Sequence, residues 1–416
     1  MKKVERAYPG RLLKKTFAAL AAAALCLFTT ATCLAGGETA AKDAGAAADT
    51  QPVTLITGDV PSDVRGAVKA SSAILVEQTT GQVLFELNAD EPRAPASITK
   101  VMTVLLVMEA LDDGRISPAD IVTASEHACS MGGSQIWLEP GETMTVDELL
   151  RATCIASSND AAVALAELIG GSEQGFVELM NAKAAELGMT NTSFKNASGL
   201  DADGHFTTAR DIAKMSAALL AHERIRSYST VWMDSLRDGK TQLVNTNKLI
   251  RFYKGATGLK TGTTDQAGRC VAASATRGEL SVIAVILGAE SRDAQFSSAA
   301  ALMNYAFDSY TMVSPPDISE QLGEVRVEGG TLSRITPVCV PPEKLLIKKG
   351  AEKTLEQIIE LPESVQAPVV AGEKIGRVIL RINGEDAGEY ALTSPCDVSE
   401  MSFGRAFGMI FASLMG

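Results

Sequence analysis

Histidine is scarce in this chain, and the three that occur, His127, His205 and His222, lie far apart. A Ser-His-Asp triad or a zinc site needs histidine close to other functional groups, so the sequence predicts neither. The sequence likewise indicates neither a metal ion nor another cofactor. We expect each histidine to be a surface residue or a polar residue whose hydrogen bonds are satisfied.

Positive charge is also in short supply. The 416 residues include 38 Lys and Arg against 50 Asp and Glu, which gives a formal net charge of -12 at pH 7. A nucleic-acid binder would present a basic face, so we expect no nucleic-acid partner. The length allows a main domain of about 250 residues and a smaller second domain.

The cysteines do not suggest a disulfide framework. Two of the seven lie in the N-terminal 35 residues, and the others form an odd set without zinc-site spacing. We expect these others to be small buried hydrophobic residues, at Cys129, Cys154, Cys270, Cys339 and Cys396. Cys154 precedes Ser157 by about one helical turn, so we expect it near that serine but without a chemical role.

The N-terminus has the pattern of a targeting segment. Basic residues precede an apolar stretch over 16–35, and Ala35 with Cys33 forms a plausible cleavage site. We therefore predict a signal peptide over residues 1–35 and an extracytoplasmic location, on the outer face of the cytoplasmic membrane. A lipoprotein modified at Cys33 and an uncleaved anchor helix are the alternatives. Residues 36–62, rich in small residues, are expected to be a spacer.

The following segment has the pattern of a mixed α/β domain. Two β-rich runs flank a glycine turn and predict a hairpin, and later runs predict helices and then strands. The expected helices cover 95–111, 146–168, 175–187, 208–220 and 293–307, and the expected strands cover 73–77, 83–87, 258–263, 269–275 and 280–287. This order predicts an antiparallel sheet with helices packed on it, an α/β (α+β) sandwich over residues 63–314.

A smaller domain and a terminal helix are expected after this sandwich. Short β runs separated by glycine turns predict an all-β domain over 315–396. Residues 399–416 have helical periodicity, with an apolar face formed by Phe403, Phe407, Ile410, Phe411 and Leu414. The segment is too short to cross a bilayer, so we expect an amphipathic helix that lies on a membrane surface. Docking of this helix on the β domain is the alternative.

A Ser-x-x-Lys tetrapeptide, Ser97 to Lys100, lies near the start of the first predicted helix. Residues i and i+3 share one face of a helix, so the hydroxyl and the amine are expected side by side. A serine hydroxyl is a poor nucleophile without a base, and lysine serves as a base when burial and nearby cations lower its pKa. Taken alone, this tetrapeptide is more typical of an ordinary helix-capping serine.

The second motif, Ser157-Ser158-Asn159, interrupts an apolar helical stretch with residues that form helices poorly. Local rules broken in this way are typical of functional sites. We expect Ser157 to relay a proton and Asn159 to hold a substrate amide. A plain loop between two helices is the alternative.

The third motif comprises Lys260, Thr261, Gly262 and Thr263 on a predicted strand, where glycine allows close approach of a ligand. We expect the lysine and the two threonines to bind a terminal carboxylate. The backbone N–H groups of Thr263 and Ser97 are expected to form an oxyanion hole. Taken alone, this motif is an ordinary junction of a strand and a turn.

The three motifs in this order resemble those of the low-molecular-mass penicillin-binding proteins, which are serine-type D-alanyl-D-alanine carboxypeptidases. The resemblance extends to segments 196–201, 208–211 and 245–247, to the β domain and to the terminal helix. It implies a β-lactamase/transpeptidase-like catalytic domain. Residue by residue, it implies that Ser97 is acylated and that Lys100 is the base. It also implies that Ser157 assists proton transfer and that Lys260 binds substrate. Arg210 is similar to a family arginine near the carboxylate site.

The resemblance also implies a substrate and inhibitors: removal of the terminal D-alanine from peptidoglycan pentapeptides, with β-lactams as covalent inhibitors. A β-lactamase of the same fold is one alternative. Against it, Ser158 stands where class A enzymes carry Asp, and no Glu-x-x-Leu-Asn run lies between Asn159 and Lys260. A non-catalytic peptidoglycan-binding protein is the other alternative, and the three intact motifs count against it.

Overall fold

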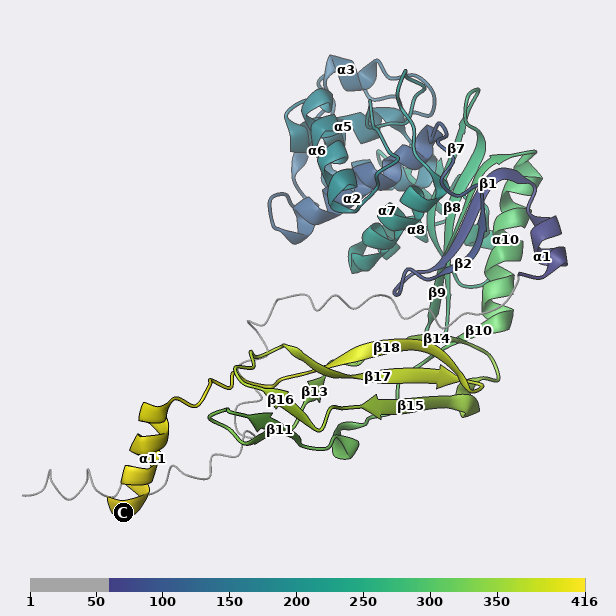
Figure 1. Cartoon of the computed structure of the whole chain (residues 1–416). Coiled ribbons are helices and arrows are strands. Elements are labelled where there is room, and N and C mark those ends of the chain that lie inside the picture. Colours follow the sequence, from purple (N-terminus) through teal and green to yellow (C-terminus); the bar gives the residue numbers. More distant parts are fainter. Residues whose placement is uncertain (1–59, 416) are drawn as a thin grey trace, which may run out of the picture.

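The structure, a computed structural model, describes residues 60–415, without the side chains of residues 409, 410 and 412–415 (Figure 1). The predicted signal peptide and most of the predicted spacer lie outside the described residues.

The first domain is built on a five-stranded antiparallel sheet, which confirms the predicted architecture. The strand order is β2-β1-β9-β8-β7, so the N-terminal hairpin pairs with the last hairpin of the domain. The three inner strands are buried along most of their length, as expected of strands covered on both faces. The bounds are β1 Ala70–Glu77, β2 Val83–Leu87, β7 Ala256–Thr264, β8 Gly268–Arg277 and β9 Leu280–Ala289.

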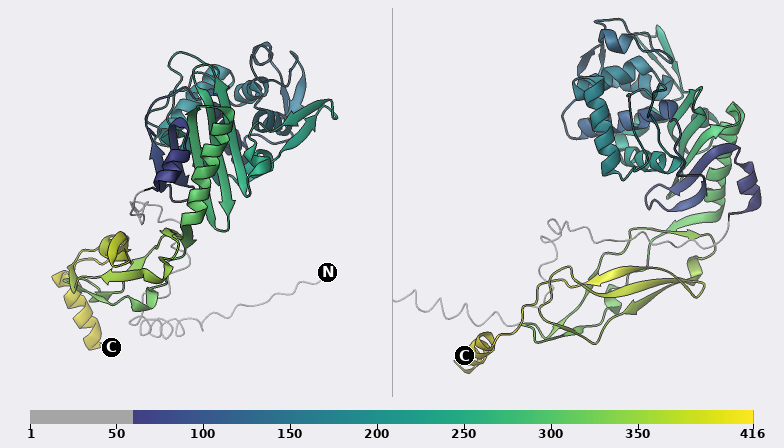
Figure 2. Two further views of the ribbon diagram at one scale, coloured as in Figure 1. Left: turned by 90° about the vertical axis from the view of Figure 1, so that its right-hand side faces the viewer. Right: turned by 45° about the horizontal axis from the view of Figure 1, so that its top comes forward.

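Helices cover both faces of this sheet (Figure 2). On one face, α10 (Arg292–Ser309) packs on β8 and β9, with the short α1 (Ser62–Ala67) beside it. On the other face, α7 (Ala209–Ala221) lies against β1 and β9, and α2 (Lys100–Asp112) packs on α7. Nearly every residue of α2 is buried, so its first residue, Lys100, is carried into the interior.

The single helix predicted over 146–168 is wrong, because the chain forms two helices with a break between them. α4 (Val146–Arg151) runs into a π-helical turn, η2 (Ala152–Ala156), and α5 (Asn159–Gly170) begins beyond it. Ser157 sits between them in the left-handed region, with φ 65°. Serine and asparagine side chains compete for backbone hydrogen bonds, which disfavours a continuous helix at this point.

The other predicted helices and strands of this domain are present. The helix predicted over 95–111 begins as a 3-10 turn, η1 (Ala96–Thr99), which continues into α2. The remaining elements are β3 Ile121–Thr123, α3 Glu126–Cys129, β4 Thr143–Thr145, α6 Glu173–Glu186, η3 Glu223–Ile225, α8 Arg226–Ser229, β5 Met233–Leu236, β6 Thr241–Val244 and α9 Leu249–Phe252.

The second domain is all-β, as predicted. It has two main sheets, β12-β11-β16 and β13-β18-β17-β15, and the pair β10-β14 joins it to the end of α10. Its elements are β10 Tyr310–Val313, η4 Ser319–Gln321, β11 Val325–Glu328, β12 Arg334–Ile335, β13 Val338–Cys339, β14 Leu345–Lys348, η5 Glu352–Thr354, β15 Leu355–Glu360, β16 Ser364–Gln366, β17 Lys374–Ile382 and β18 Glu385–Thr393. The domain boundary at residue 315 stays a prediction.

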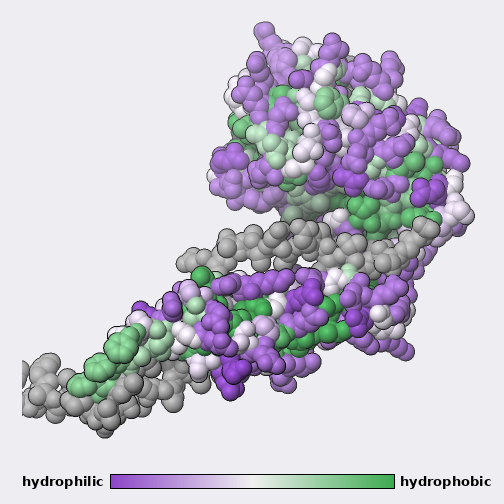
Figure 3. All heavy atoms as spheres, in the orientation of Figure 1, coloured by the Kyte–Doolittle hydropathy of each residue, from purple (hydrophilic) through white to green (hydrophobic). Residues whose placement is uncertain are grey.

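The terminal helix, α11 (Phe403–Met415), projects from the end of the β domain (Figure 1). Phe403, Phe407 and Phe411 are 87%, 60% and 55% exposed, and successive rings stack with centroids 6.4 Å apart. Figure 3 shows the hydrophobic side chains along this helix. Within residues 60–415, no helix has both the length and the apolar character needed to cross a membrane.

The cysteine prediction is only partly right. Cys154 and Cys270 are buried, whereas three others, Cys129, Cys339 and Cys396, are partly exposed.

The histidines behave as expected of surface or satisfied polar residues. His127 and His222 pair with carboxylates near the surface, and His205 is buried with both ring nitrogens in hydrogen bonds.

Candidate active site

The Ser-x-x-Lys motif spans the junction of η1 and α2. In 3-10 geometry residues i and i+3 are eclipsed, and Ser97 Oγ lies 3.1 Å from Lys100 Nζ. The preceding residue, Ala96, has φ 47°, a conformation that is uncommon for alanine. Strained backbone of this kind is concentrated at functional sites.

Lys100 is fully buried, and three oxygen atoms surround its amine. Besides Ser97 Oγ, Nζ lies 2.5 Å from Asn159 Oδ1 and 2.6 Å from the Ser198 carbonyl oxygen. The last two oxygens can only accept. A neutral amine has two N–H donors and one lone pair, so donation to these two oxygens leaves the lone pair for the Ser97 O–H.

Burial favours the neutral form of this lysine. It holds the pKa of Lys100 well below its ordinary value, and the charge of Lys260 lowers it further, against an opposing effect of Asp160. A buried group with a strongly perturbed pKa beside a nucleophile is typical of a catalytic base.

The Ser157-Ser158-Asn159 motif lies at the helix break. Ser157 lines the cleft with Ser97, whereas Ser158 does not. Asn159 bridges two segments, because its Oδ1 accepts from Lys100 and its Nδ2 donates to the Gly132 carbonyl at 2.6 Å. The break therefore aims Ser157 into the cleft and fixes Lys100 at the same time.

The third motif lies on the edge strand β7, directly against the Ser-x-x-Lys turn. A Cβ atom on Gly262 would lie 2.9 Å from Ala96 Cβ and 3.0 Å from Ser97 N, so only glycine allows this close approach. Thr261 Oγ1 donates to Thr246 Oγ1 at 2.7 Å. Lys260 Nζ donates to the Thr261 carbonyl oxygen at 3.1 Å, and burial lowers the Lys260 pKa to about 8.

These motifs meet at one open cleft. Of the predicted site residues, Ser97, Ser157, Thr261, Gly262 and Thr263 line it, and Lys100, Asn159 and Lys260 are connected to it by the contacts above. The cleft is also lined by residues that the sequence interpretation missed: Ser134, Thr246, Arg269, Arg292, Gln295 and Phe296. The two arginines come from β8 and the start of α10. No local motif marks them, and only the fold brings them to the third motif.

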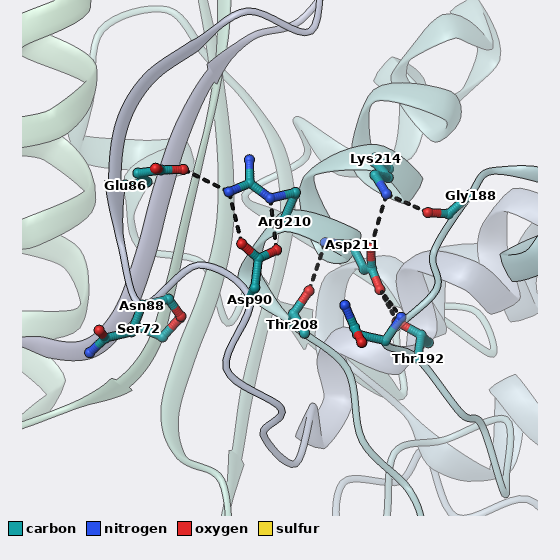
Figure 4. Close-up of polar contacts among 11 residues, drawn as sticks. Ser72, Glu86, Asn88, Asp90, Gly188, Thr192, Thr208, Arg210, Asp211 and Lys214 are labelled. Atoms are coloured by element: carbon teal, nitrogen blue, oxygen red, sulfur yellow. Dashed lines mark hydrogen bonds and ion pairs between the residues drawn. The ribbon is translucent and has the colours of Figure 1, made fainter.

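Arg210 does not line this cleft, so the expectation for it is corrected. Its guanidinium donates to Asp90 at 2.8 and 3.0 Å and to Glu86 at 2.7 Å, at the start of α7 (Figure 4). Hydrogen bonds to these two carboxylates raise its pKa. Arg210 therefore ties α7 to the end of β2 and to the segment that follows it.

Cys154 is buried close to Lys260, and burial raises its thiol pKa to about 12. The thiol is therefore protonated and a poor nucleophile, in line with the expectation that it has no chemical role.

Comparisons with known proteins agree with this geometry. Residues 59–291 match the family described as D-alanyl-D-alanine carboxypeptidase (peptidase S11), and residues 310–400 match the family described as penicillin-binding protein 5, C-terminal domain. The D-alanyl-D-alanine carboxypeptidase DacF of Bacillus subtilis is 43% identical over 341 residues, which cover 81% of this chain and 88% of the relative.

Solved structures show the same likeness. Penicillin-binding protein 5 from Haemophilus influenzae superposes with a TM-score of 0.75 at 29% identity, over 83% of this chain and 100% of that one. Penicillin-binding protein D2 from Listeria monocytogenes, in its ampicillin-bound form, gives 0.53 at 32% identity, over 58% of this chain and 98% of that one.

The contact between β7 and the Ser-x-x-Lys turn can be tested by adding one methyl group. Gly262→Ala should slow acylation by a fluorescent penicillin by about 10- to 100-fold, because a displacement of about 1 Å at a reacting group costs up to about 100-fold. Gly66→Ala is the matched control, since no atom lies within 4 Å of a Cβ at that position. A Gly262→Ala protein that acylates at the wild-type rate would contradict the tight contact.

Proposed function

The chain belongs to the D-alanyl-D-alanine carboxypeptidase family of serine peptidases, and from this premise we propose how its cleft works. Ser97 removes the terminal D-alanine from a peptidoglycan pentapeptide through an acyl-enzyme. The observation that carries the proposal is the contact of Lys100 Nζ with Ser97 Oγ and with two oxygens that only accept, which in the neutral amine leaves the lone pair for the Ser97 hydroxyl.

Acylation follows from these positions. The Ser97 proton passes to Lys100 Nζ as Oγ attacks the carbonyl carbon of the penultimate D-alanine. The negative charge on the carbonyl oxygen is held by the backbone N–H groups of Ser97 and Thr263, both of which line the cleft. The C–N bond then breaks, and the D-alanine amine receives the proton held by Lys100 through the Ser157 hydroxyl, which returns Lys100 to its neutral form. The product is an ester on Ser97 and free D-alanine.

Deacylation uses the same base. A water molecule gives a proton to Lys100 and attacks the ester carbonyl. The C–O bond to Ser97 breaks, and Oγ takes the proton back. A β-lactam would acylate Ser97 by the first of these steps, as the ampicillin-bound relative suggests.

The substrate carboxylate is bound by cationic and hydroxyl groups of β7, β8 and α10. Thr261 and Thr263 on β7 supply hydroxyls, and the buried Lys260 supplies charge. Arg269 and Arg292 line the same cleft and add positive charge. Asn159 orients the substrate amide while it holds Lys100 in place.

The location follows from the same function. Peptidoglycan lies outside the cytoplasm, so we propose that the protein is exported by its N-terminal segment. α11 then lies on the outer surface of the cytoplasmic membrane and inserts the stacked rings of Phe403, Phe407 and Phe411 into the interface.

The activity itself is tested with a Lys-D-Ala-D-Ala peptide. Wild-type protein should release D-alanine, and penicillin should block the release. Ser97→Ala should lose both release and penicillin labelling, because within residues 60–415 Ser97 carries the one hydroxyl that contacts Lys100 Nζ. Rapid penicillin hydrolysis without D-alanine release would indicate a β-lactamase, and neither reaction would indicate a binding protein.

The two lysines predict the pH dependence. Acylation needs neutral Lys100 and charged Lys260, so the rate should rise as Lys100 loses its proton and fall as pH passes about 8, where Lys260 loses its own. Lys260→Arg keeps its charge, so the alkaline fall should move upward by about one pH unit or more. Measurement of kcat/KM from pH 5 to 10 checks this, and an unmoved alkaline limb in Lys260→Arg would assign it to another group.

The terminal helix predicts membrane binding. Deletion of residues 399–416 should release the protein from vesicles of bacterial lipids while D-alanine release from a soluble peptide is unchanged. Phe407→Glu in the full chain is the matched variant, since it keeps the length and charges the apolar face. Cosedimentation that is unaffected in both proteins would refute the membrane role of α11.

A further inference from the structure

His205 lies in the interior of the first domain, close to the Ser-x-x-Lys turn but outside the cleft. It belongs to the connection between α6 and α7 and is 6% exposed. The next two residues anchor the backbone, because Phe206 bridges to Ser193 and Thr207 bridges to Arg93. The imidazole is therefore held on a fixed stretch of chain.

Both ring nitrogens of His205 are used, and the partners determine the tautomer. The backbone N–H of Lys195 donates to Nδ1 at 3.2 Å, so Nδ1 must carry a lone pair. The proton of the neutral ring is then on Nε2, which donates to Thr99 Oγ1 at 2.9 Å. The ring thus joins the Ser-x-x-Lys turn to the loop that begins at Lys195.

That loop also holds the base. Its Ser198 carbonyl accepts from Lys100 Nζ at 2.6 Å, and its Ala197 carbonyl accepts from Thr103 Oγ1 at 2.7 Å. A Cβ on Gly199 would lie 1.9 Å from the Ala96 carbonyl oxygen, so loop and turn are in direct contact. Within this loop, the His205 imidazole binds the Ser97–Lys100 turn through its hydrogen bond to Thr99.

We propose that His205 is a positioning residue for acylation, which holds the Ser97–Lys100 turn against the loop that supplies the Ser198 carbonyl. The inference rests on the proposed function of Ser97 and Lys100. Without the imidazole, Thr99 loses its anchor, and the Ser97 hydroxyl and the Lys100 lone pair lose their alignment. His205 touches neither substrate nor reacting atoms.

The environment keeps the ring in the required form. Burial lowers the His205 pKa to about 4, Lys195 lowers it too, and Asp201 opposes them. The unfolded chain therefore binds the proton more readily, so this group contributes stability above its ordinary pKa and loses it as pH falls from about 6.5 toward 4. Protonation would turn Nδ1 into a donor facing the Lys195 N–H.

The test compares substitutions at both ends of the Thr99–His205 bond. His205→Ala should slow penicillin acylation and lower kcat by about 10- to 100-fold with KM changed by less than about threefold, as expected for lost alignment. His205→Gln, whose amide can donate to Thr99, should recover most of the rate. His222→Gln is the matched control, since His222 pairs with Asp112 far along α2.

A double-mutant cycle decides whether the ring acts through Thr99. Thr99→Val should slow acylation like His205→Ala, and the double variant should be no slower than the slower single one. Additive losses, or a wild-type rate in His205→Ala, would overturn the proposal.

The tautomer of the His205 ring can be measured without any reaction rate. With three histidines in the chain, nitrogen NMR of the imidazoles is simple to assign against the His205→Gln spectrum. A charged or Nδ1-protonated His205 at pH 7 would overturn the proposal. If wild-type and His222→Gln proteins both failed to bind penicillin and to release D-alanine, the proposed function itself would fall.

Discussion

The burial of one lysine amine, with no carboxylate of residues 60–415 in direct contact with it, constrains the whole site. Because a charged ammonium in that position would cost several kcal/mol, burial lowers the pKa of Lys100 and favours the neutral amine, whose two N–H groups then need acceptors. Asn159 Oδ1 and the Ser198 carbonyl are those acceptors, which in the neutral amine leaves the lone pair for the Ser97 hydroxyl 3.1 Å away. Lys100 therefore depends on its hydrogen-bond acceptors to act as a base. The Ser97–Lys100 turn, Asn159 and Ser198 come from three separate segments, which have to meet for the base to form.

Those segments meet because local conformations depart from regular structure at the right places. The π-turn and left-handed Ser157 end α4, so that Asn159 opens α5 and reaches Lys100. Gly262 lets the edge strand approach the turn, and Gly199 lets the loop approach it from another side. The rigid sheet and the buried helix α2 hold these irregular pieces in place, which is consistent with strain being tolerated only where its surroundings are well packed.

Sequence reasoning predicts the parts of this site whose chemistry is local. The three motifs, the antiparallel sheet and the all-β domain follow from residue types and periodicity. Apolar periodicity over 146–168 favours one helix despite the interruption at Ser157-Ser158-Asn159, because a second helix with the same apolar character follows the break. Arg269 and Arg292 could not be predicted, since only strand pairing and the start of α10 bring them to β7. Arg210 was expected at the site, but Asp90 and Glu86 hold its guanidinium elsewhere.

The protonation state of Lys100 tests this account most directly. Nitrogen NMR of protein with labelled lysine side chains, assigned against Lys100→Arg, reports whether the amine is neutral. The account predicts a neutral amine for Lys100 at neutral pH in the unacylated protein, with Lys260 still charged. A charged Lys100 under those conditions would contradict the central claim, since its lone pair would then be unavailable to the Ser97 hydroxyl.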